Sequence, residues 1–117
     1  MGQERREYRR ADLRFVIKYR RAGALMDLWR DGTMTDLSAG GLRFSTEELI
    51  DQGVTLEFQI LLPIRKDPYV LVGQVVSEAP SEPQRSEYGA AFVDVSPDKQ
   101  VEVDELVQFL TRRRDEG

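Results

Sequence analysis

Short strand-like segments follow one another along most of the chain, and no helical stretch comes between them. Each combines β-branched or aromatic residues with partial alternation of apolar and polar positions, and turn-forming residues separate it from the next. A Rossmann-type sheet needs alternating strands and helices, so this order argues for an antiparallel arrangement instead. We expect extended structure over residues 13–19, 24–33, 33–37, 41–45, 54–62, 69–77 and 88–95.

Turn signals refine the N-terminal part of this pattern. Gly23 suits a hairpin turn after the first segment. The second segment then centres on residues 25–29, and Asp31 and Gly32 are expected to end it.

Three further signals lie in the second half of the pattern. The double glycine at 40–41 predicts a tight turn. Gly73 lies inside a strand and therefore indicates a bulge or a close approach of another backbone. Residues 79–86 are polar and contain two prolines, which predicts a loop.

The C-terminal segment predicts one amphipathic helix. Ser96 is a favourable N-cap, and Pro97 suits the first helical position, where an N–H would have no partner within the helix. One apolar stripe then follows at helical spacing, formed by Val103, Leu106, Val107 and Leu110.

These patterns predict a mainly β protein, with about six antiparallel strands in a small barrel or sandwich that the C-terminal helix caps. The length of 117 residues fits one ordinary domain. We divide it into an Arg-rich arm, residues 1–12, and a folded body, residues 13–117. The arm has little apolar content, so we expect it to be flexible.

The net charge of −4 conceals an asymmetry between these two parts. Residues 1–21 hold eight basic and three acidic side chains, whereas the rest of the chain holds nine basic and eighteen acidic ones. A basic arm on an acidic body indicates an anionic partner for the arm. A solubilising tail that pairs loosely with its own domain fits the same charges.

The chain contains neither cysteine nor histidine. It therefore has no disulfide, no zinc–thiolate site, no cysteine nucleophile and no Ser-His-Asp triad. We expect no enzymatic activity, no metal and no cofactor. The longest strongly apolar run is far shorter than a membrane span, so we expect a cytoplasmic protein without membrane insertion.

Two motifs carry the functional signal, and the first is an arginine pair spaced by four, Arg6 and Arg10. Guanidinium groups donate paired hydrogen bonds to phosphate or to the O6 and N7 acceptors of guanine, and they stack on purine rings. Two such side chains can therefore hold both the charge and the base of a nucleotide. Solvated arginine-rich segments are nevertheless common.

The second motif is Asp36-x-Ser38-x-x-Gly41. Its carboxylate can accept hydrogen bonds from N1–H and the N2 amino group of guanine, its hydroxyl can reach a phosphate, and its glycine permits a close backbone approach. A turn between two strands, stabilised by the serine side chain, explains the same residues without any ligand.

Together the motifs resemble the PilZ domain family, in which an RxxxR motif in an N-terminal loop precedes a [D/N]xSxxG motif. The resemblance covers roughly residues 5–110 and extends to the strands around residues 72–76 and 88–94. It implies a six-stranded antiparallel PilZ-like β-barrel with a C-terminal helix, in agreement with the strand pattern.

The resemblance also implies a receptor for the bacterial second messenger cyclic di-GMP. It assigns ligand binding to the arm and to one barrel surface. An arginine directly before the first motif resembles the family pattern for a stacked pair of ligands, and no family role is implied for the extra Arg9. The implied binding residues are Arg5, Arg6, Arg10, Asp36, Ser38 and Gly41.

One position departs from the family pattern: Ser77 stands where many members carry an arginine, which puts a ligand contact from that strand in doubt. The implied mechanism is a switch in which ligand binding folds the arm over the barrel. A separate effector protein then reads the closed surface.

Two alternatives remain at this point. A PilZ-like module could act through protein contacts without binding the nucleotide. A small barrel with a basic arm could also bind nucleic acid, although the acidic body disfavours a long phosphate track.

Overall fold

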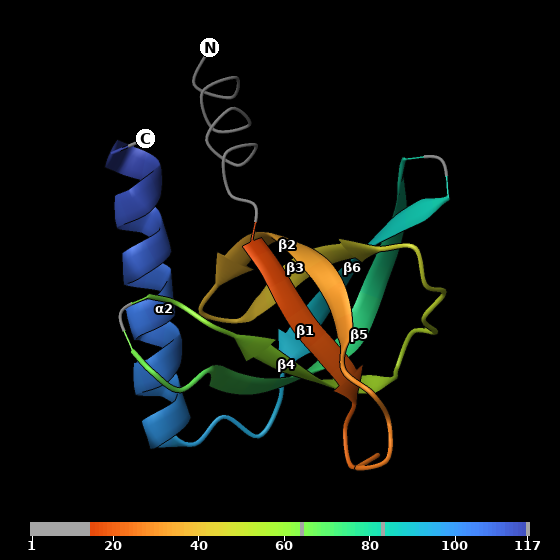
Figure 1. The fold of residues 1–117 in the computed structure, drawn as a ribbon, viewed down its shortest axis with the longest axis horizontal. Coiled ribbons are helices and arrows are strands. Elements are labelled where there is room, and N and C mark those ends of the chain that lie inside the picture. The colour runs from red at the N-terminus through yellow and green to blue at the C-terminus, as the bar shows by residue number, and fades with distance from the viewer. Residues whose placement is uncertain (1–14, 64, 83, 117) are drawn as a thin grey trace.

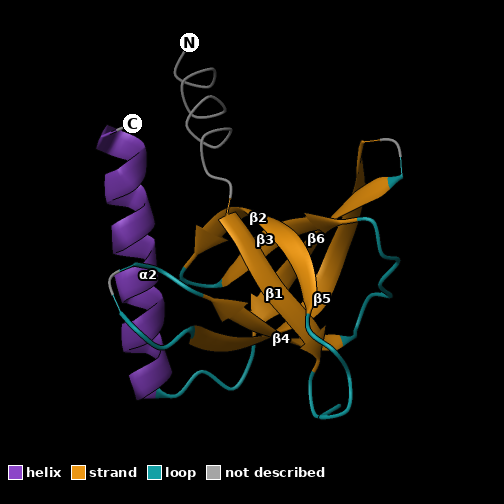
Figure 2. Ribbon diagram, in the orientation of Figure 1, coloured by secondary structure: helices purple, strands orange, loops and turns teal. Residues whose placement is uncertain are grey.

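The computed structural model of the chain describes residues 15–63, 65–82 and 84–116. The predicted flexible arm, residues 1–12, lies outside them. Six antiparallel strands close into a barrel in the order β1-β2-β3-β6-β5-β4, and one helix packs beside it (Figures 1 and 2). Within these described ranges, the elements are β1 (Phe15–Arg21), β2 (Arg30–Ser38), β3 (Gly41–Thr46), β4 (Thr55–Ile60), β5 (Tyr69–Glu82), β6 (Arg85–Phe92) and α2 (Pro97–Glu116).

The predicted mainly β fold with a C-terminal helix is thus confirmed. β1 pairs with β2 on one side and with β4 on the other, and this second pairing closes the barrel. The predicted turn at the double glycine joins β2 to β3, and Gly23 adopts a positive φ of 79° in the connection after β1, as a turn there requires.

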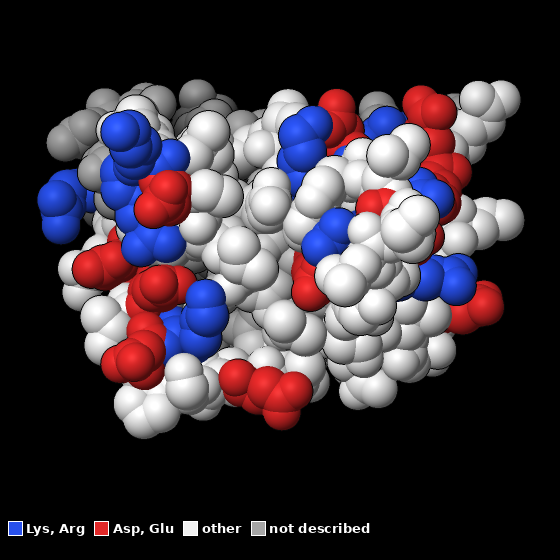
Figure 3. Space-filling view, turned by 60° about the horizontal axis from the view of Figure 1, so that its bottom comes forward, with Lys and Arg blue, Asp and Glu red and all other residues white. Residues whose placement is uncertain are grey.

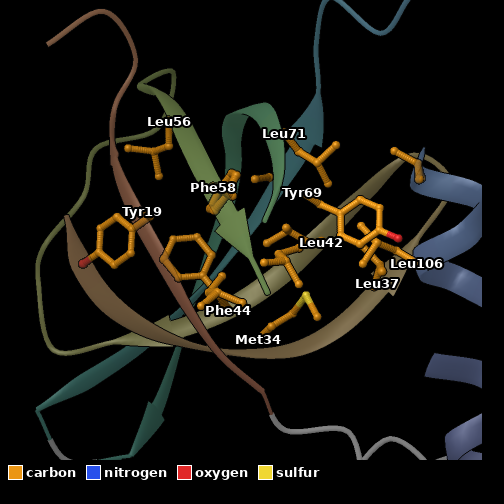
Figure 4. Packing of buried hydrophobic residues seen from close by; sticks show 14 of the residues in the cluster. Tyr19, Met34, Leu37, Leu42, Phe44, Leu56, Phe58, Tyr69, Leu71 and Leu106 are labelled. Atoms are coloured by element: carbon orange, nitrogen blue, oxygen red, sulfur yellow. The ribbon is translucent and has the colours of Figure 1, made fainter. Parts of the chain in front are cut away.

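The core is built from side chains that alternate inward along the strands. Phe44 lies at its centre, with ring centroids 5.2 Å from Tyr19, 5.4 Å from Phe58 and 5.8 Å from Tyr88. Tilted and edge-on ring pairs of this kind stabilise the packing beyond the area that they bury. Figure 4 shows Leu37, Tyr69 and Leu106 at the side of the core next to the helix.

Helix α2 follows the predicted pattern. The backbone N–H of Lys99 donates to Ser96 Oγ at 3.2 Å, so Ser96 is the N-cap. Val103, Leu106 and Leu110 are fully buried against the barrel, and this burial anchors the helix.

The second predicted strand is wrong in its position. Residues 22–29 form a loop in which Leu25, Met26 and Leu28 are 76%, 94% and 82% exposed. The strand begins only at Arg30, and Gly32, expected to end a strand, lies inside it. A side chain at Gly32 would lie within 3.4 Å of the Phe44 and Tyr19 rings, so the glycine makes room for the aromatic core.

The predicted loop over residues 79–86 is also wrong, because β5 and β6 continue there as a long hairpin whose last pair is Glu82 with Arg85. The prediction of a bulge or a close approach at Gly73 is confirmed for the close approach. A Cβ there would lie 3.3 Å from the backbone carbonyl oxygen of Ala91 and also 3.3 Å from the Phe58 ring. The bulge lies farther along, between Val75 and Ser77.

The loop after β3 is fastened to the barrel by two buried tyrosines. Tyr19 donates to Glu48 Oε1 at 2.5 Å, and the Tyr88 hydroxyl donates to the Glu48 carbonyl at 3.1 Å while accepting from the N–H of Ile50 at 2.9 Å. Burial, assisted by the hydrogen bond to Glu48, raises the pKa of Tyr19 to about 12.

Among the described residues, no helix has the length and apolar character to cross a membrane.

Candidate functional site

The Asp36-x-Ser38-x-x-Gly41 motif spans the end of β2 and the start of β3. A register shift between Met34 and Asp36 leaves Thr35 as the extra residue of a bulge. After it, Asp36 and Ser38 alternate to the outer face of the barrel, and Leu37 between them points inward and is only 6% exposed. The core therefore fixes the direction of both polar side chains.

The local hydrogen bonds explain why these residues form this turn. Asp36 Oδ1 accepts from the N–H of Leu37 at 2.9 Å. Ser38 Oγ lies 3.4 Å from both the N–H of Gly40, from which it accepts, and the carbonyl oxygen of Gly41, to which it donates. The serine thus serves the turn, as the ligand-free explanation predicts, and these long contacts leave its exposed hydroxyl able to exchange partners.

Gly41 lies where β3 closely approaches β6. A Cβ at this position would overlap the carbonyl oxygen of Ala90 and lie 3.2 Å from the Cα of Ala91. The carbonyl oxygen of the neighbouring Gly40 accepts from the N–H of Phe92 at 2.9 Å, which fixes the turn against β6. Gly40 itself has no atom within 4 Å of its Cβ position. Only the second glycine is required by close packing.

Four strands bring the motif into two parallel rows on the outer face. The first row crosses β2, β3, β6 and β5 through Asp36, Arg43, Gly89 and Ser77. The second row crosses the same strands through Ser38, Gly41, Ala91 and Gln74.

Between the rows lies an open groove of about 240 Å³. Its floor is nearly free of side chains, because three of the four middle positions of the rows are Gly41, Gly89 and Ala91, and only the fourth, Arg43, is long. Asp36 and Ser38 border it on one side, and Ser77 Oγ projects over Gly89 on the other, 2.5 Å from where a Cβ would be. A flat floor with polar edges can hold a planar ring and hydrogen-bond its rim.

The structure therefore brings Asp36, Ser38 and Gly41 together. The three predicted arginines, Arg5, Arg6 and Arg10, lie outside the described residues, as does Arg9. The groove also contains Arg43 and Gly89, which the sequence interpretation did not assign to the site. Only the register of β3 against β6 places them there, and the motif pattern alone gave no signal for them.

Charges of both signs are interspersed on the surface that Figure 3 shows, along the helix at the left and around the opposite edge. No group of three or more acidic side chains within the described ranges could hold a metal ion. The described lining residues of the groove offer hydrogen-bonding groups and one cation, Arg43. This chemistry suits binding of a polar, partly anionic ligand.

The PilZ domain family model matches residues 4–111. No curated protein sequence matches the chain significantly. Among solved structures, the PilZ domain of CeSA from a cellulose-synthesizing bacterium is similar with a TM-score of 0.62, at 15% identity, over 84% of this chain and 93% of that one.

Two further solved structures share the fold. The PilZ domain of YcgR from Escherichia coli, solved with c-di-GMP, has a TM-score of 0.67 at 14% identity, over 86% of this chain and 85% of that one. A pathogenic protein from Xanthomonas campestris, a tetrameric PilZ domain self-assembled through a helical bundle, has a TM-score of 0.61 at 19% identity, over 80% of this chain and 52% of that one. At these identities the likeness concerns the fold.

Proposed function

The chain belongs to the PilZ domain family, a family of cyclic di-GMP receptors, and from this premise we propose that it binds cyclic di-GMP and signals to a separate effector protein. The observation that carries the proposal is the groove, where Asp36, Ser38 and Gly41 meet on one open surface. All three stand in the positions of the family's second motif, and Arg6 and Arg10 complete its first motif.

In the proposed complex, the groove takes a guanine ring on its flat floor. The Asp36 carboxylate accepts from N1–H and the N2 amino group, and the Ser38 hydroxyl donates to a polar atom of the ligand. Arg6 and Arg10 contact the phosphates and the guanine acceptor edge from the arm. Arg5 adds a third guanidinium, which we assign to a second, stacked ligand molecule.

The strand register supports contact between the arm and the groove. Phe15 pairs with Met34, so the chain that precedes β1 joins the barrel four residues before Ser38 on the neighbouring strand. Arg10 precedes Phe15 by five residues, a span of at most about 18 Å. An extended arginine side chain adds further reach, so Arg10 can contact the groove without any change in the barrel.

The proposed mechanism is a switch without a chemical step. A ligand that contacts both arm and groove shifts the arm toward the position in which both are engaged, because it binds that state more tightly. The effector would read the combined surface of arm and barrel. We place this receptor in the cytoplasm. We do not expect nucleic acid as its ligand, since the chain after residue 21 holds nine basic and eighteen acidic side chains, which disfavours a phosphate track.

Isothermal titration calorimetry with cyclic di-GMP tests the proposal. Wild type should bind saturably, Arg10→Ala should bind at least tenfold more weakly, and GTP should give no signal. Arg21→Ala is the matched control, because Arg21 is exposed at the opposite end of β1 from the arm. A stoichiometry of two would support the stacked pair. A flat wild-type titration would refute the receptor and favour a module that works through protein contacts alone.

A further inference from the structure

We propose that Arg43 is a further ligand-binding residue. When the nucleotide binds, Arg43 separates from Glu87 and contacts a phosphate of the ligand. This inference rests on the proposed function and adds to it a contact from the barrel itself. It starts from the groove, where Arg43 is the one cation among the described lining residues.

The strand register directs Arg43 toward the groove. It projects from β3 on the outer face, directly opposite Asp36 on β2 and Gly89 on β6. Gly89 has no side chain of its own, and Ser77 Oγ from the next strand lies over it, 2.5 Å from where a Cβ would be. Arg43 itself lines the groove, so its long side chain can reach a ligand that lies on the floor.

The present partner of Arg43 holds it weakly. Arg43 Nη1 lies 3.9 Å from Glu87 Oε1, at the limit of an ion pair, and the Arg43 side chain is 56% exposed. Exposed pairs of this kind contribute little stability. Glu87 is the fixed member of the pair, because its other oxygen, Oε2, accepts from Thr35 Oγ1 at 2.6 Å and its side chain is 28% exposed. Arg43 is thus the member that can move.

A phosphate is the better partner for this guanidinium. It offers oxygens in the geometry of the guanidinium fork, and charge-assisted pairs of this kind are short and strong. Asp36 brings a negative charge to the same row, which would repel a phosphate unless a cation offset it. Arg43 is placed to provide that charge, and Glu87 is its competitor in the free protein.

If Glu87 competes with the ligand for Arg43, removing the charge of Glu87 should change ligand affinity. If the Arg43–Glu87 pair only stabilises the fold, it should not. Glu87→Gln removes the competing charge but keeps an oxygen that can accept from Thr35. It should therefore tighten cyclic di-GMP binding, by about two- to fivefold. A structural pair would lose stability in this variant and gain no affinity.

Calorimetric titration with cyclic di-GMP at two salt concentrations tests the inference. Arg43→Ala and Arg43→Gln should each weaken binding at least tenfold and make the affinity less dependent on salt, because a phosphate contact has been lost. Arg30→Ala is the matched control: Arg30 is also an exposed arginine paired with a glutamate, at 3.3 Å from Glu48 Oε2, and it does not line the groove. Its affinity should stay within twofold of wild type.

The outcomes separate the two proposals. If wild type binds and both Arg43 variants bind within twofold of it, the inference is wrong and the proposed function stands. If Glu87→Gln binds more weakly than wild type, Glu87 does not compete for Arg43, and the inference is overturned as well. If wild type itself does not bind, both proposals fail. Thermal melts of each variant exclude loss of folding as the cause of weaker binding.

Discussion

The carbonyl oxygen of Ala90 fills the space in which a side chain at Gly41 would begin. This contact joins the second motif to β6, so the glycine of the motif has a packing role in addition to any role toward a ligand. β3 and β6 could accept a larger residue at position 41 only by moving apart. The groove on the outer face of these strands would then change shape.

Gly41→Ala should therefore destabilise the fold by about 1–3 kcal/mol, the usual cost of overpacking a well-packed contact. Gly40→Ala is its neighbour and control, because a Cβ at Gly40 meets nothing within 4 Å. Urea denaturation should place Gly40→Ala within about 0.5 kcal/mol of wild type. Equal stability of the two variants would contradict the close approach.

Asp36→Ala should weaken cyclic di-GMP binding by about tenfold or more, because a hydrogen bond to a charged group contributes about 1.5–3 kcal/mol. Asp36→Asn should lose less, since its amide oxygen can still accept from the N–H of Leu37 and from one ligand donor. Calorimetry with both variants checks this order. Equal affinity of Asp36→Ala and wild type would remove Asp36 from the proposed site.

The raised pKa of Tyr19, about 12, predicts a loss of stability in alkali. The unfolded chain releases this proton near pH 10, whereas the folded protein keeps it until about pH 12. The contribution of Tyr19 is therefore fully present below pH 10 and is lost as the pH rises toward 12, by up to about 2 kcal/mol. The free energy of unfolding, measured by denaturation at several pH values between 9 and 12, should fall less steeply with pH for Tyr19→Phe than for wild type. An equal fall in both proteins would show that Tyr19 does not cause the loss.

Replacing a methionine by alanine should affect stability very differently at two positions. Met34 is fully buried in the core, whereas Met26 is 94% exposed in the loop after β1. Met34→Ala should cost about 2–5 kcal/mol because it leaves a cavity, and Met26→Ala should change stability by less than about 0.5 kcal/mol. Thermal melts followed by circular dichroism measure both. A large loss for Met26→Ala would mean that the loop packs against the barrel.

The sequence predicted the helix and the fold class well, because those features depend on local patterns. Ser96, Pro97 and the apolar stripe specify the helix within a few turns of chain. The strand at residues 25–29 was predicted wrongly for the same reason: Leu25, Met26 and Leu28 have the composition of a strand, and only the rest of the barrel shows that no surface covers them.

The site could be predicted only as far as its motifs. The resemblance to the PilZ family assigned Asp36, Ser38 and Gly41 to one barrel surface, because together they match its second motif. Arg43 and Gly89 belong to different strands, and their pairing depends on the register of β3 against β6. Register follows from the inward alternation of the whole barrel, which a motif does not contain.

The seam between β1 and β4 also has a consequence for synthesis of the chain. β1 takes β2 as one partner and β4 as the other, and Arg20 and Glu57 meet across this second pairing at 2.9 Å. At about 5–20 residues per second, β4 leaves the ribosome some seconds after β1. Throughout that interval one edge of β1 has no strand beside it. The barrel can therefore close only late in the synthesis of the chain.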